Sequence, residues 1–148
     1  MSNYVIYNTT SGKIVYSILL TNDTDIDSIT ANVGAGEDYL QGGDSDAVSN
    51  SYVNAGVVVP LLEFEDTSGW DTTTISANGT STATFGSALP NPTQVQIRPD
   101  TTTTGATALT TINVTDGSLS FATFAPAVYS FEISAFPYRT IITTVTAS

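Results

Sequence analysis

Three aspartates spaced two residues apart form the group of side chains most suggestive of chemistry. Asp23, Asp25 and Asp27, in NDTDID, have the spacing that opens an EF-hand calcium loop. The residues that complete such a loop are missing, because Ser28 stands where it needs a glycine and Gly34 where it needs a bidentate glutamate. We therefore predict a solvated acidic turn and no metal site, with weak calcium binding as the alternative.

The composition contains few of the side chains that usually carry out catalysis. The chain has no histidine and no cysteine, which removes the commonest general base and the thiol nucleophile. The remaining possibility is a pair of carboxylates, as in glycoside hydrolases. Most Asp and Glu fall in predicted turns, however, and lack the burial that raises the pKa of a general acid. The serines have no histidine to activate them, and Lys13 lies in a predicted hairpin. We predict that the protein is not an enzyme, with no catalytic residue and no cofactor.

Three other features are weaker candidates for binding sites. The acidic run GGDSD (42–46) matches less of a calcium loop than NDTDID does. The run GAGED (34–38) is similar to a phosphate-binding glycine loop, but it neither follows a long apolar strand nor opens a helix. Trp70 with Tyr52 or Tyr39 would suit a sugar-stacking platform. Because single aromatic residues of β-rich chains usually fill cores or interfaces, we interpret them that way.

The charge of the chain excludes several classes of partner. Three Lys and Arg stand against 14 Asp and Glu, for a formal net charge of −11. Nucleic acids and anionic membrane surfaces both require clustered cations, so we predict that neither is a partner. We find no targeting segment and no run of 18 apolar residues, and expect a soluble protein made in a cytoplasm.

The pattern of residues predicts an all-β chain whose first part is rich in hairpins. Thr, Val, Ile and Tyr dominate, and apolar residues with helical spacing are scarce. The runs YVIY (4–7) and KIVYSILL (13–20), joined by NTTSG, predict one hairpin. A short strand is expected around EDYLQ (37–41), and a second hairpin at 51–60, turning at Asn54-Ala55-Gly56 and ending at Pro60.

From Thr72 onward, short strands recur at the spacing of an immunoglobulin-like antiparallel β-sandwich. We place a hairpin-rich docking module at 1–66 and the sandwich at 67–148, and interpret LLEFEDTSGW (61–70) as the connector across this boundary. We expect 67–148 to fold alone and 1–66 not to do so. The run DTTTTGAT (100–107) is expected to be a loop. The predicted strands are TTTISA, TSTATFG, TQVQIRP, ALTTINVT, GSLSFATF, VYSFEISAF and RTIITTVTA.

The clearest of these strands lies at 129–135. Tyr129, Phe131, Ile133 and Ala135 alternate with Ser130, Glu132 and Ser134, as in a half-buried antiparallel strand. Asp116-Gly117 predicts a turn between two strands. Pro137 predicts a corner between the last two strands, where Arg139 would pair with a nearby carboxylate or a neighbouring chain.

Several stretches, taken in order, resemble a family of short virion proteins of tailed bacteriophages. They are YVIYNTTSGKIVYS, GAGEDYLQGG, YVNAGVVVP, VTDGSLSF, YSFEISAFPYR and the closing TVTAS, which together span nearly the whole chain. Leu61-Leu62 replaces an arginine that follows VVP in the family, Ala125-Pro126-Ala127 replaces its Pro-Gly, and DTTTTGATALTT (100–111) is longer than in the family.

The resemblance implies a structural protein of the virion, made in the host cytoplasm, with no catalytic residues to carry over. The lead expectation is a tail-associated accessory or fibre component that docks through 1–66 and projects the immunoglobulin-like domain. The alternative is a decoration protein on the capsid, and a third hypothesis is a carbohydrate-binding or adhesin module for host attachment. The expected partners are other virion proteins and copies of the chain in a symmetric assembly, with a host surface glycan under the third hypothesis.

Overall fold

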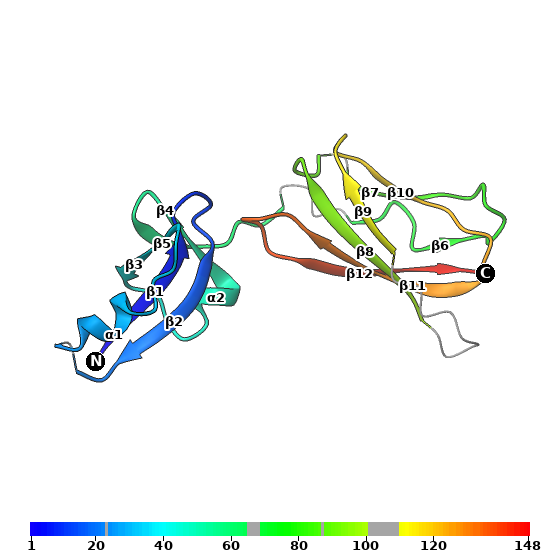
Figure 1. Cartoon of the computed structure of the whole chain (residues 1–148). Helices are drawn as coiled ribbons and strands as arrows, with labels where there is room; N and C mark the ends of the chain where they lie inside the picture. Colours follow the sequence, from blue (N-terminus) through cyan, green and yellow to red (C-terminus); the bar gives the residue numbers. More distant parts are fainter. Residues whose placement is uncertain (23, 65–68, 87, 101–109) are drawn as a thin grey trace. The chain divides into compact units, whose positions relative to one another are not determined.

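The computed structural model describes residues 1–22, 24–64, 69–86, 88–100 and 110–148. Strands dominate throughout, which confirms the all-β prediction. The chain divides into two compact units, Met1–Leu62 (unit 1) and Glu63–Ser148 (unit 2) (Figure 1). The sequence placed the boundary at residue 66, but Phe64 is buried in the core of unit 2.

Unit 1 is built on a three-stranded antiparallel sheet. Strand β1 (Ser2–Asn8) lies between β2 (Ile14–Leu20) and β3 (Glu37–Gln41). The hairpin predicted from YVIY and KIVYSILL and the strand predicted at EDYLQ are both present. The Oδ1 atom of Asn8 closes the hairpin, because it accepts hydrogen bonds from the N–H groups of Thr10 and Ser11 at 3.0 and 2.9 Å.

Both faces of this sheet are covered, since successive residues of β1 point to opposite sides. One cluster is Tyr4, Ile6, Leu20 and Ile29, the last from α1 (Ile26–Thr30). The other cluster is Val5, Ile14, Ala47 and Val53, contributed in part by α2 (Ala47–Asn50) and β4 (Ser51–Asn54). Neither helix was predicted, and α1 overlaps only the last two residues, Ile26 and Asp27, of the stretch expected to be an acidic turn (22–27). Helices of five and four residues are too short to show a helical repeat of apolar residues.

The second predicted hairpin pairs β4 with β5 (Val57–Pro60) through a turn at Ala55 and Gly56. Ala55 and Gly56 have φ angles of +50° and +76°, which match the two left-handed positions of a type I′ turn. The N–H of Val53 donates to the carbonyl of Gly12 at 2.8 Å. A Cβ atom on Gly12 would collide with the carbonyl of Val53, so a glycine is needed where this hairpin meets the β1–β2 turn.

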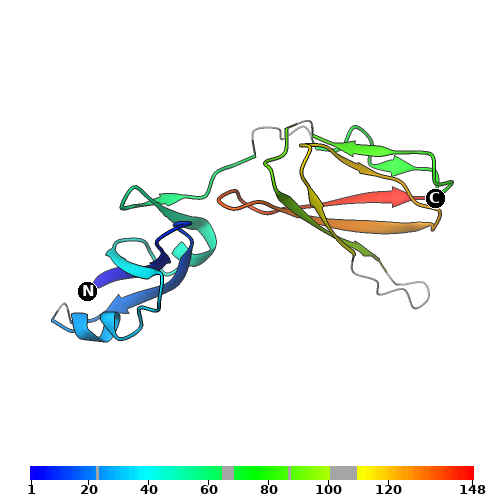
Figure 2. The same cartoon turned by 45° about the horizontal axis from the view of Figure 1, so that its top comes forward.

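Unit 2 contains all seven strands predicted from residue 72 onward. Five form one sheet in the order β6-β12-β11-β8-β9, with β6 parallel to β12 and the other pairs antiparallel, and β7 pairs with β10. Strands β11 and β12, orange and red in Figure 2, run side by side over their full lengths. The bounds are β6 Thr74–Ile75, β7 Ala83–Phe85, β8 Thr93–Pro99, β9 Thr110–Val114, β10 Leu119–Phe121, β11 Ala127–Ser134 and β12 Ile141–Ala147.

Residues from both sheets of unit 2 share one hydrophobic core. Tyr129, Phe131, Ile133 and Ala135 are buried, which confirms the predicted apolar face of this strand. Phe131 packs against Trp70 from the opposite side of the core, with ring centroids 4.8 Å apart. The other buried members are Phe64, Ile75, Ala83, Phe85, Leu89, Val95, Val114, Leu119, Val145 and Ala147.

The corner predicted at Pro137 lies between β11 and β12. The N–H of Tyr138 donates to the carbonyl of Ala135 at 2.6 Å. Arg139 Nε lies 2.8 Å from Glu63 Oε1, so the predicted pairing with a carboxylate is confirmed within unit 2. The loop predicted at 100–107 lies, apart from Asp100, outside the described residues.

Candidate functional site

Two of the aspartates that suggested a calcium loop lie at the start of a short helix. Asp25 precedes α1 and its carbonyl accepts hydrogen bonds from the N–H and the hydroxyl of Ser28, while Asp27 lies in the first helical turn. Asp23 lies outside the described residues. In GGDSD, Asp44 Oδ1 accepts the N–H of Asp46 at 2.9 Å. Within the part of the chain that the structure describes, no three acidic residues are grouped closely enough to hold a metal ion.

The glycine loop at 34–38 is occupied by its own carboxylate. The N–H of Gly34 donates to Glu37 Oε2 at 2.8 Å. A phosphate site needs backbone N–H groups that point at the ligand, whereas here the N–H of Gly34 already donates to the carboxylate of Glu37. The interpretation that GAGED is not a phosphate loop agrees with this geometry.

The three aromatic residues considered as a sugar platform lie in different surroundings. Trp70 is 9% exposed and packs between Phe85 and Phe131, so it is a core residue, as we interpreted it. Tyr39 packs against Tyr4 in unit 1. Tyr52 lies on β4 at the edge of a surface hollow. Trp70 therefore belongs to no exposed platform.

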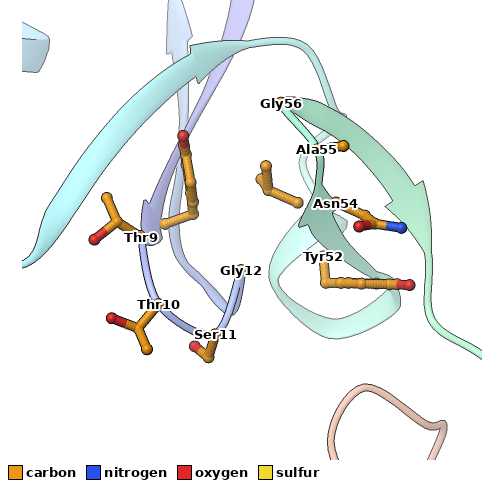
Figure 3. A pocket seen from close by; sticks show the side chains of 10 residues that line it. Thr9, Thr10, Ser11, Gly12, Tyr52, Asn54, Ala55 and Gly56 are labelled. Atoms are coloured by element: carbon orange, nitrogen blue, oxygen red, sulfur yellow. The ribbon is translucent and has the colours of Figure 1, made fainter.

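This hollow lies between the β1–β2 turn and the β4–β5 hairpin and has a volume of about 340 Å³. Figure 3 shows Thr9 and Thr10 on one side and Tyr52 and Asn54 on the other, with Gly12 between them. Thr9 Oγ1 is already engaged, because it donates to the carbonyl of Gly36 at 3.0 Å. The lining is uncharged, which suits the hollow to holding a neutral polar group. Its residues are Tyr7, Thr9, Thr10, Ser11, Gly12, Tyr52, Val53, Asn54, Ala55 and Gly56.

Part of the lining of this hollow belongs to an uncharged segment with exposed apolar side chains. Residues 47–62 contain no Asp, Glu, Lys or Arg, although the chain as a whole is strongly acidic. Val57 and Leu62 on this segment are 57% and 42% exposed. Protein–protein contact surfaces are depleted of charged residues at their centre, so a segment without charges that exposes apolar side chains is suited to contact with another molecule. We call residues 47–62 the neutral segment.

Sequence reasoning missed the exposure of Phe124, an aromatic residue in the connection between β10 and β11. It belongs to the run GSLSFATF, which predicts a strand through Phe124, but β10 ends at Phe121. The proline at 126 was the one signal against a longer strand, because proline disrupts the pairing of central strands.

Comparisons with protein-family models, curated proteins and solved structures found no match to this chain. Among the helices that the structure describes, none has the length and apolar character needed to cross a membrane.

Proposed function

We propose that this chain is a non-enzymatic structural protein of a tailed-bacteriophage particle. It binds the particle through unit 1 and carries unit 2 as an immunoglobulin-like domain. Our preferred hypothesis places it on the tail of the particle, and the alternative places it on the capsid as a decoration protein. The virion assignment rests on the resemblance of the motifs, and the neutral segment is the observation that carries a binding role.

The immunoglobulin-like assignment of unit 2 is supported by its strand order. In immunoglobulin sandwiches the chain passes back and forth between two sheets. Here β7 and β10 form one sheet, and the strands before and after each of them belong to the other sheet, β6-β12-β11-β8-β9. A second support is Tyr129, near the start of β11, whose hydroxyl donates to the carbonyl of Ala125 at 2.9 Å. A tyrosine at this position that bonds back to the upstream backbone is a hallmark of these domains.

The docking role of unit 1 is supported by how charge is distributed along its sequence. Its Asp and Glu residues fall between 23 and 46, and the neutral segment follows them. A partner suited to this surface presents apolar side chains to Val57 and Leu62, and basic residues where it meets the acidic part of unit 1. This charge also excludes the packaged genome as the partner, because like charges repel.

Localisation on intact particles tests the virion assignment. We expect antibody label or added density at the tail end of purified particles. Label spread evenly over the head supports the decoration alternative instead. Absence of the protein from purified particles contradicts both positions and with them the proposed function.

Substitution in the neutral segment tests the mode of docking. Val57→Asp places a charge on the exposed face of the β4–β5 hairpin and is expected to abolish incorporation into particles. The matched control is Ile142→Asp, since Ile142 on β12 of unit 2 is 72% exposed. Equal incorporation of the two variants contradicts docking through the neutral segment.

A further inference from the structure

Phe124 is 80% exposed, yet both residues beside it are fixed by hydrogen bonds. The N–H of Ala125 donates to Thr123 Oγ1 at 3.1 Å. The Tyr129 hydroxyl lies 3.0 Å from Thr123 Oγ1 and donates to the carbonyl of Ala125 at 2.9 Å. The backbone on each side of Phe124 is thereby tied to β11, so this aromatic residue is held in place while its side chain faces water.

A glycine on the facing loop provides the seat for the ring. The N–H of Gly79 donates to the carbonyl of Thr123 at 2.9 Å. A Cβ atom on Gly79 would collide with the Cζ, Cε1 and Cε2 atoms of Phe124, so the far edge of the ring lies against this glycine. Gly79 has a φ of +75°, which a side chain at this position would also disfavour. Fixing the ring in advance lowers the entropy that a ligand has to overcome on binding.

The two loops that carry Gly79 and Phe124 are polar but contain no charged side chain. Residues 72–82 and 117–127 contain no Asp, Glu, Lys or Arg. The turn that bears Gly79 is rigid, because Asn78 Oδ1 accepts hydrogen bonds from the N–H groups of Thr80 and Ser81 at 2.9 and 2.8 Å. An exposed, flat apolar ring on loops of neutral polar residues is the complement of a pyranose, which has an apolar C–H face and a polar rim.

We propose that Phe124 is the stacking platform of a binding site for a neutral saccharide, formed by the Gly79 turn and the β10–β11 connection. A protein interface fits these observations less well, because a stable one buries about 800 Å² on each partner around several apolar anchors. The platform lies in unit 2 and does not depend on the virion assignment. A negative result in the particle experiments therefore does not contradict the saccharide site. Likewise, a failure to bind saccharides does not contradict the virion assignment.

Titration of the full chain with neutral oligosaccharides tests the platform. The probes are cellohexaose, maltohexaose, mannohexaose and chitohexaose at millimolar concentration, followed through the backbone amide NMR signals. We expect at least one probe to shift the signals of Gly79, Thr123 and Phe124. Phe124→Ala is expected to lower the affinity for that probe about tenfold or more.

Two further variants separate stacking from general apolar contact. Phe124→Trp keeps a flat ring and is expected to retain binding, whereas Phe124→Leu keeps apolar surface without a ring and is expected to lose it. Ile142→Ala, at an exposed apolar residue of the five-stranded sheet, is the control and is expected to bind like the parent chain. Equal binding by Phe124→Leu and the parent chain overturns the stacking proposal. Shifts that avoid Gly79 and Thr123, or no shift with any probe, overturn the site.

Discussion

At the scale of the residue, Ala55 is the one non-glycine residue with a positive φ in the described parts of the chain. An L-residue in the left-handed region costs roughly 1–2 kcal/mol relative to the right-handed region. Ala55 keeps this conformation because the two-residue turn joining β4 and β5 requires it. The neutral segment therefore holds local strain at the tip of its hairpin.

Ala55→Asn is expected to stabilise the protein by about 0.5–1 kcal/mol, because asparagine tolerates the left-handed region and favours type I′ turns. The matched control is Ala31→Asn, since Ala31 is exposed and has a φ of −65°. Urea unfolding of both variants measures the difference. A gain of the same size at Ala31 would show that the effect is unrelated to the turn.

At the scale of the element, the alternation of apolar and polar residues predicted the strands but could not reveal the short helices. Strand β11 was predicted because its apolar residues alternate over its length, and these residues are buried in the core shared by the two sheets of unit 2. Helix α1 buries a single residue, Ile29, which leaves no repeat to detect. The seat of Phe124 was equally hidden, because it depends on a contact with Gly79, far away in the sequence. Tertiary contacts of this kind carry no local signal.

Phe131→Ala tests the predicted core face of β11 and is expected to cost about 3–5 kcal/mol of unfolding free energy, because it leaves a cavity under Trp70. Glu132→Ala on the opposite, exposed face is expected to change stability by less than about 0.5 kcal/mol. Urea unfolding provides the measurement. Equal costs at the two positions would contradict the orientation of this strand.

Calcium is expected to leave the melting temperature unchanged. Asp25 directly precedes α1 and Asp27 lies in its first turn, so these residues are not arranged as the open loop that calcium requires. A ligand at a hundredfold excess over its Kd would add about 2.7 kcal/mol to stability. A rise of several degrees in millimolar calcium, reversed by a chelator, would refute this prediction.

At the scale of the whole molecule, the two units differ in how their cores are built. Unit 2 has one large cluster that joins both of its sheets, whereas unit 1 has two clusters of four buried residues each. Small, divided cores contribute little stability on their own. We therefore expect unit 1 to be marginal as an isolated fragment and to gain stability from the surface on which it docks.

The boundary between the units predicts how two fragments of unit 2 differ in stability. Phe64 is buried and stacks on Tyr138 with ring centroids 5.1 Å apart, so a fragment 63–148 keeps this contact and a fragment 67–148 loses it. We expect 63–148 to unfold cooperatively and to be more stable than 67–148 by about 3 kcal/mol. The ion pair of Glu63 with Arg139 is solvent-exposed and adds about 1 kcal/mol or less.

Two substitutions in the fragment 63–148 apportion that difference. Phe64→Ala is expected to reproduce most of the loss, while Glu63→Ala is expected to reproduce little of it, because the aromatic ring fills space in the core and the exposed ion pair is screened by solvent. Urea unfolding of the four proteins supplies the comparison. Equal stability of 63–148 and 67–148 would place the boundary at residue 66 and would make Phe64 part of the connection rather than of the core.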